Sequence, residues 1–167
     1  EGAAWSTLPL GPRYSFYADP FFGHDAGEIF VEALNKRTGK GEVVRVIGDQ
    51  QQSIIGFGGH VSYPAPVDHD GRQLLVPETV NWLPLTAFDV TDGRAEPVSA
   101  VDIDEPKILD PTFLRWDGRI YLFGNVLSEG ENVLHLWHAD DLGSRFERHP
   151  ASPIRVSARG SRMAGEV

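Results

Sequence analysis

One short phrase recurs three times in this chain of 167 residues. Each copy has a proline that is followed seven residues later by a glycine, and the copies start at Asp19-Pro20, Tyr63-Pro64 and Asp110-Pro111. The prolines lie 44 and 47 residues apart. A repeat of about 40–50 residues with four short strands is typical of a β-propeller blade. The chain is therefore expected to be all-β, a β-propeller of four-stranded blades.

Alternating and β-branched runs between polar turns predict the strands within each repeat. The expected blades cover about residues 17–58, 60–102 and 107–150, and a fourth unit opens at 157–167. Asp-Gly pairs at 70–71, 92–93 and 117–118 favour type I′ hairpin turns, because both central residues of that turn need positive φ.

Closed propellers usually have about 4–8 blades, so we expect residues 1–167 to form a single, incomplete propeller with about three blades. The remaining blades or another domain of a longer chain are then expected partners. An open arc exposes blade faces and sheet edges, which would favour self-association. A compact three-unit β fold is the alternative.

Composition excludes several classes of function. The net charge of −9 argues against nucleic acid or an anionic membrane surface as the main partner. No apolar run approaches ~20 residues, so no membrane span is expected. The absence of cysteine excludes disulfides, thiol catalysis and cysteine-based zinc sites, and fits the cytoplasmic location that we expect. The histidines lack metal-like grouping, so neither a metal site nor a cofactor is expected.

Acidic residues recur at equivalent places in the repeats. The first strand of a blade lies nearest the propeller axis, so Asp19, Tyr63 and Asp110 should meet at one opening, with Glu32 and Glu78 on the second strands. Paired carboxyl groups about 5–10 Å apart are what sugar hydrolysis needs. Asp19, Glu78 and Asp110 are therefore the candidate catalytic residues. The alternative is that an Asp before proline satisfies local backbone N–H groups.

Four further residues are candidate substrate-binding groups. They are Glu32, His60, Tyr63 and Arg162. His60 follows a glycine at the entrance to the second repeat, where it could bind a ligand or serve as a structural loop residue. Arg162 could hold a carboxylate or phosphate, or could be an ordinary surface arginine. Tyr63 is the one aromatic residue expected at the opening rather than in blade packing.

Six motifs occur in a fixed order along about 150 residues. They are Tyr17-Ala18-Asp19-Pro20-Phe21, Gly39-Lys40-Gly41-Glu42-Val43, His60-Val61-Ser62-Tyr63-Pro64, Val76-Pro77-Glu78-Thr79, Asp110-Pro111-Thr112 and Ser161-Arg162-Met163-Ala164-Gly165. Together they resemble the propeller domain at the N-terminus of the glucosamine inositolphosphorylceramide transferases, which also occurs in bacterial proteins, some with a formyltransferase-like domain. That domain is similar to the five-bladed propellers of arabinanase, levansucrase and invertase glycosidases. The resemblance implies that the chain holds about three of a probable five blades.

The chain departs from this family at two points. It has Met163 where the family usually has proline, and the family continues through further blades. The glycosidase comparison implies that Asp19 matches the first-blade acid, whereas the second-blade acid has no counterpart at Ser62-Tyr63. In the ceramide transferases, sugar transfer is attributed to a separate domain. The resemblance therefore implies glycan recognition more than turnover.

The sequence thus leads to three functional hypotheses. The first is a carbohydrate-handling propeller that recognises a glycan or glycolipid in surface-polysaccharide or glycolipid assembly. The second is a glycosidase or glycosyl-transferring enzyme that uses paired carboxylates, for which a raised pKa on one acid would be evidence. The third is a non-catalytic protein-interaction propeller, in which the acids would not converge.

Overall fold

The computed structural model describes residues 7–56, 58–79, 82–91, 93–105 and 107–162. Within these ranges the chain forms strands and turns without a helix, and hence no helix long and apolar enough to cross a membrane. The strands form three antiparallel sheets, one for each repeat. The predicted fold class, an all-β propeller of four-stranded blades, is confirmed.

Each blade is a meander in which neighbouring strands along the chain pair with one another. Blade one has the order β1 (Tyr14–Phe22), β2 (Glu28–Asn35), β3 (Gly41–Ile47) and β4 (Gln50–Ile55). Blade two has β5 (Ser62–His69), β6 (Arg72–Glu78), β7 (Thr86–Asp89) and β8 (Glu96–Ala100). Blade three has β9 (Ile108–Trp116), β10 (Arg119–Val126), β11 (Val133–Ala139) and β12 (Glu147–Arg148), with β13 (Arg155–Val156) as an addition.

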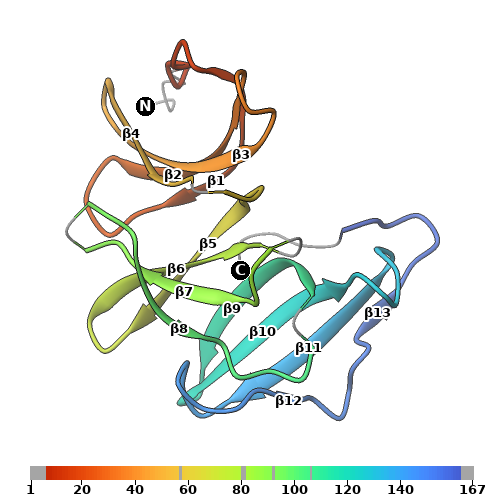
Figure 1. Ribbon diagram of the computed structural model, residues 1–167. Helices are drawn as coiled ribbons and strands as arrows, with labels where there is room; N and C mark the ends of the chain where they lie inside the picture. Colours follow the sequence, from red (N-terminus) through yellow and green to blue (C-terminus); the bar gives the residue numbers. More distant parts are fainter. Residues whose placement is uncertain (1–6, 57, 80–81, 92, 106, 163–167) are drawn as a thin grey trace, which may run out of the picture.

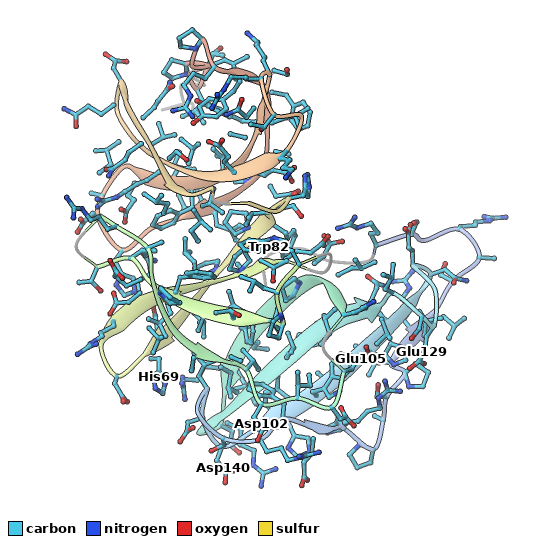
Figure 2. The ribbon with its side chains drawn as sticks, in the orientation of Figure 1. His69, Trp82, Asp102, Glu105, Glu129 and Asp140 are labelled. Carbon is cyan, nitrogen blue, oxygen red and sulfur yellow. The ribbon has the colours of Figure 1, made fainter. Side chains whose placement is uncertain are left out.

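The three blades follow one another in an arc, with the first strands β1, β5 and β9 in contact along its inner side (Figure 1). Apolar side chains fill the space between the blades (Figure 2). Phe30 and Val43 of blade one pack with Leu75 and Phe88 of blade two. A second cluster joins blades two and three and includes the fully buried Trp137. Full burial of one such side chain stabilises the fold by roughly 1.5–3 kcal/mol.

The Asp-Gly turns adopt the backbone expected of them. Both residues have positive φ at Asp70-Gly71 (50° and 74°) and at Asp117-Gly118 (49° and 75°). In the remaining pair, at 92–93, Gly93 also has a positive φ, and residue 92 lies outside the described residues. These turns fix the register of the hairpins that carry the inner strands.

Blade three differs from its expected end at about residue 150. β12 covers only two residues, and the chain then returns to the same sheet, where β13 pairs with β11 through Val133–Val156 and Leu134–Arg155. Pro150 and Pro153 interrupt this stretch, and proline cannot donate a ladder hydrogen bond. The predicted fourth unit at 157–167 is described only as far as Arg162, so the fourth blade and the total of five stay predictions.

Candidate functional site

Four residues with the same unusual backbone mark the inner side of the arc. Asp19, Tyr63, Asp110 and Arg162 have φ of 45°, 46°, 49° and 50°. Such values are uncommon for residues other than glycine. Three of the four precede the recurring proline, and Arg162, which is followed by methionine, lies in the predicted fourth unit.

A β-bulge accompanies this backbone in each of the three blades. The ladder between the first and second strand is out of register after Ala18, after Ser62 and after Leu109. A bulge redirects the side chain of the extra residue and is common beside functional sites. Here the redirected residues are the two aspartates and the tyrosine that the repeat predicted.

The second strands contribute an equivalent set. Glu32 pairs with Ala18, Glu78 with Ser62, and Asn125 with Leu109, so these three occupy one position in successive blades. Glu32 and Glu78 are buried, with 8% of each residue exposed. Asn125 is fully buried and donates from Nδ2 to the carbonyl oxygens of Glu131 and Val133 (3.0 and 2.8 Å). In blade three the equivalent residue, Asn125, is therefore uncharged and binds the backbone of the loop that follows β10.

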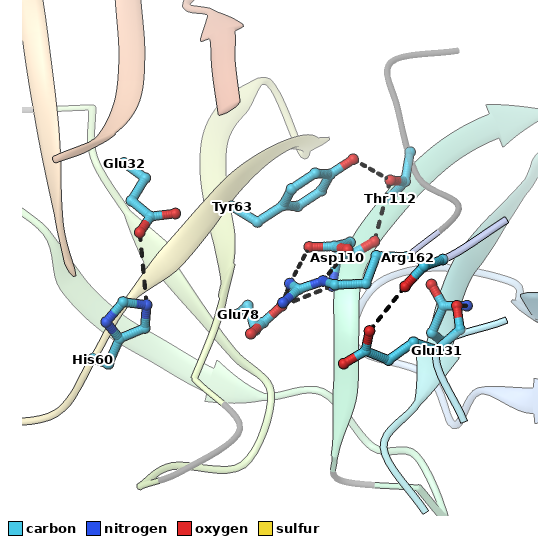
Figure 3. A network of polar contacts seen from close by, with 10 residues as sticks. Glu32, His60, Tyr63, Glu78, Asp110, Thr112, Glu131 and Arg162 are labelled. Carbon is cyan, nitrogen blue, oxygen red and sulfur yellow. Dashed lines mark hydrogen bonds and ion pairs between the residues drawn. The ribbon is translucent and has the colours of Figure 1, made fainter. Parts of the chain in front are cut away.

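The four residues with left-handed backbone, together with Glu32 and Glu78, open onto a single pocket of about 470 Å³. Its lining consists of Asp19, Glu32, His60, Ser62, Tyr63, Glu78, Asp110 and Arg162. All seven predicted site residues are thus brought together, with Ser62 as the addition, and Figure 3 shows most of them from close by. The catalytic and binding roles assigned to them from the sequence stay predictions.

Arg162 joins two of the carboxylates. Its Nε lies 2.7 Å from Oδ2 of Asp110, and its Nη2 lies 2.5 Å from both Oδ1 of Asp110 and Oε2 of Glu78 (Figure 3). The same Oε2 accepts the backbone N–H of Asp110 at 3.0 Å. These contacts raise the pKa of Arg162 against the opposing effect of burial. Burial raises the pKa of Glu78, although the Asp110 N–H and Arg162 lower it.

Glu32 is the carboxyl group with the most altered acidity. Its pKa is raised to about 7. Burial is the largest cause, the charges of Asp19 and Glu78 contribute, and Arg162 offsets only part of the rise. Burial and the charge of Asp110 also raise the pKa of Asp19, whereas Arg162 and a hydrogen bond with Glu32 lower it. Glu32 is therefore partly protonated near neutral pH.

His60 borders this pair of acids. Its Nδ1 accepts the backbone N–H of Gly41 at 2.9 Å, so the ring proton lies on Nε2, which is 3.6 Å from Oε1 of Glu32. Burial and Arg162 lower the pKa of His60. Trp82, labelled in Figure 2, donates from Nε1 to the carbonyl oxygen of His60 at 2.8 Å. His60 thus presents a neutral N–H donor to Glu32.

Tyr63 lines the pocket in a different way. The residue is 5% exposed, its ring meets Phe21 edge to face at 5.0 Å, and its hydroxyl lies 2.7 Å from Oγ1 of Thr112. The ring belongs to the apolar packing between inner strands. A sugar ring therefore has little access to its face.

Some contributors escaped the sequence analysis. The carbonyl oxygen of Glu131 accepts the N–H of Arg162 at 2.7 Å, and its Oε2 accepts from Ser161 at 2.9 Å, which holds Arg162 over the pocket (Figure 3). Glu131 lies in a loop without any repeat signal. Asn125 did have one, since it follows Glu78 by 47 residues as Glu78 follows Glu32 by 46. Among the described residues, no group of three or more His, Asp or Glu side chains could hold a metal ion.

Comparison with known proteins gives a likeness of fold. No protein-family model and no curated protein matches the chain. Similar solved structures include Zg3597, a family 117 glycoside hydrolase of the marine bacterium Zobellia galactanivorans, with a TM-score of 0.65 and 16% identity over 92% of this chain and 62% of that one. GH43B of a Bacteroides ovatus xyloglucan locus has a TM-score of 0.57 and 13% identity, and the match covers 83% of this chain and 29% of that one. The exo-β-1,3-galactanase 1,3Gal43A of Clostridium thermocellum has a TM-score of 0.51 and 13% identity, and the match covers 78% of this chain and 34% of that one.

The chain spans at most 62% of the length of these structures. Identities of 13–16% establish a shared glycosidase-like propeller fold and no more. The narrower resemblance to the ceramide transferase propellers stays a prediction.

Proposed function

We propose that this chain binds carbohydrate in the pocket between Asp19, Glu78 and Arg162. The convergence of residues from the repeats on one open, polar pocket carries the proposal. The pocket offers carboxylate acceptors beside guanidinium and imidazole donors, and sugar hydroxyls use both kinds of partner. The glycoside hydrolases of similar fold support the same class of ligand.

Recognition is favoured over hydrolysis by the way the acids are paired. Glu78 and Asp110 share the charge of Arg162, so they position that side chain rather than transfer protons. Asp19 and Glu32 interact with each other, so neither is an independent acid or base. The proposed role is therefore glycan or glycolipid recognition, in surface-polysaccharide or glycolipid assembly.

One observation favours an enzyme as the second candidate. A carboxyl group with a pKa of about 7, such as Glu32, is matched to proton donation at neutral pH, and Asp19 would be the base or nucleophile beside it. A ligand that separated the two carboxyl groups would create the spacing that hydrolysis needs. The interaction-module alternative predicted acids that do not converge, and it is the weakest of the three.

The experiment is a binding screen of the protein against a panel of immobilised oligosaccharides. Asp19→Asn should abolish or weaken binding roughly tenfold, because it removes an acceptor from the pocket. Asp117→Asn is the matched control, since Asp117 has the same left-handed backbone (φ 49°) in a hairpin turn outside the pocket. Equal binding by both variants would refute the assignment of this pocket. Release of sugar by the wild type, lost in Glu32→Gln, would favour the enzyme.

We also propose, from the sequence, a cytoplasmic location, further blades as partners and self-association of an open arc. Exposed apolar side chains on blade three, such as Trp116 (68% exposed) and Val156 (64%), fit the last of these.

A further inference from the structure

A second pocket lies further along the same inner strands. It has a volume of about 290 Å³ and is bordered by Phe22, His24, Asp68, Gln73, Phe113 and Arg115. It shares no lining residue with the first pocket. An apolar cluster of Phe21, Tyr63 and Ala65, packed on Phe113, lies between them, with Tyr63 on the first pocket and Phe113 on the second. The two pockets are therefore separate sites.

Gln73 places an unused hydrogen-bond donor in this pocket. The residue is only 7% exposed, and its Oε1 accepts the backbone N–H of His24 at 3.2 Å. That contact fixes which amide atom is oxygen, so Nε2 is the group left over. Nε2 has no hydrogen-bond partner within the described part of the chain. This N–H group is open to water in the pocket, so the acceptor of a ligand could take the place of that water.

The rim combines opposite charges with an exposed aromatic ring. Nε2 of His24 lies 2.5 Å from Oδ1 of Asp68, which joins blades one and two, and Arg115 donates to the carbonyl oxygen of Asp68 at 3.4 Å. Phe22 is 69% exposed. Asp68 would repel a phosphate and Arg115 would repel an ammonium group. A neutral hydroxyl group both donates and accepts hydrogen bonds, so it suits both side chains.

We infer that the second pocket binds one neutral pyranose ring, with its C–H face on Phe22 and its hydroxyl groups bonded to Gln73, Asp68 and Arg115. The volume suits a single ring better than a chain of sugars. This site is additional to the proposed glycan pocket and does not depend on it, because no residue is common to both.

The side-chain amide of Gln73 offers a direct readout in a ¹H–¹⁵N correlation spectrum of the labelled protein. The probes are the methyl α-D-pyranosides of glucose, galactose and mannose, titrated into the millimolar range. At least one should shift the Gln73 amide signals saturably. Phe22→Ser and Arg115→Ala should each weaken this binding about tenfold. Phe16→Ser and Arg119→Ala, at exposed positions outside the pocket, should leave it unchanged.

Asp19→Asn separates this inference from the proposed function, because it alters only the first pocket. The Gln73 shifts should persist in that variant even if glycan binding at the first pocket is lost. The inference is wrong if none of the three glycosides moves the Gln73 amide, or if the shifts survive in Phe22→Ser and Arg115→Ala. Shifts caused by inorganic phosphate and not by the glycosides would also overturn it.

Discussion

Arg162 and Asp110 stand 52 residues apart in the sequence, and their side chains meet in a two-point ion pair. Nε contacts Oδ2 at 2.7 Å and Nη2 contacts Oδ1 at 2.5 Å. Both residues have left-handed backbones. The last described turn of the chain is thus held against the inner strand of blade three by this ion pair.

Removing the Arg162 guanidinium should destabilise the fold. Arg162→Leu leaves Glu78 and Asp110, both less than 9% exposed, without their cation. Breaking a buried pair costs about 3–5 kcal/mol, and the 40% exposure of the Arg162 side chain reduces our expectation to roughly 1–3 kcal/mol. Urea unfolding at neutral pH measures the loss.

Two further variants control this prediction. Arg162→Lys keeps the charge and loses the two-point geometry, so its loss should be smaller. Arg119→Ala removes an exposed arginine 3.9 Å from Asp140 and should change stability by less than about 0.5 kcal/mol. A loss in Arg162→Leu no larger than that of Arg119→Ala would show that the ion pair contributes little.

The protein should become less stable as pH rises, because folded Glu32 holds a proton that the unfolded chain has already released. The folded-state pKa of about 7 exceeds the unfolded value of about 4.3, so the folded protein binds more protons between these values. The stabilisation is complete below about pH 4.3 and is lost as pH rises through about 7. Other carboxyl groups also titrate in the acidic range. The difference in the free energy of unfolding between the wild type and Glu32→Gln isolates the contribution of Glu32.

Glu32→Gln stays neutral at every pH. Its free energy of unfolding relative to the wild type should rise by roughly 2–3 kcal/mol between about pH 4.5 and 8, measured by urea unfolding. Asp117→Asn, in an exposed turn, should show no comparable change. A flat difference for Glu32→Gln would contradict the raised pKa.

Gly41 should not tolerate a side chain. A Cβ there would lie 2.3 Å from the carbonyl oxygen of Val61 and 3.1 Å from Oε1 of Glu32. Gly41→Ala should therefore cost about 1–3 kcal/mol and displace His60, which accepts the Gly41 N–H. Thermal unfolding of Gly41→Ala and Gly143→Ala checks this, since the nearest atom to a Cβ at Gly143 is 3.4 Å away. Equal melting temperatures for the two variants would mean that the blades can separate to make room.

The repeat made much of this fold predictable. The recurring proline and glycine indicated blades, and equivalent positions in blades converge, so Asp19 and Asp110 could be assigned to one opening from spacing alone. The return of β13 to blade three could not be foreseen, because it rests on two pairs in a proline-interrupted stretch. Left-handed backbone at Asp19 and Arg162 was equally hidden, since residues other than glycine rarely adopt it.

The chemistry of the pocket was less accessible to sequence reasoning. Glu32 was assigned to binding from its place on a second strand, yet its acidity depends on burial and on Asp19 and Glu78, which only the packed blades bring near. Tyr63 was expected at the opening from its position in the repeat. The contact with Phe21, which turns its ring into the core, belongs to neighbouring blades and leaves no local pattern.

The central claim is that carboxyl groups of separate blades share one pocket, and an NMR titration of the Glu32 carboxyl carbon tests it most directly. We predict a midpoint near 7 in the wild type, lowered in Asp19→Asn because one neighbouring negative charge is gone, and unchanged in Asp117→Asn. A midpoint near 4.3 in the wild type, insensitive to Asp19→Asn, would contradict the account, since Glu32 would then titrate as an isolated, solvated acid.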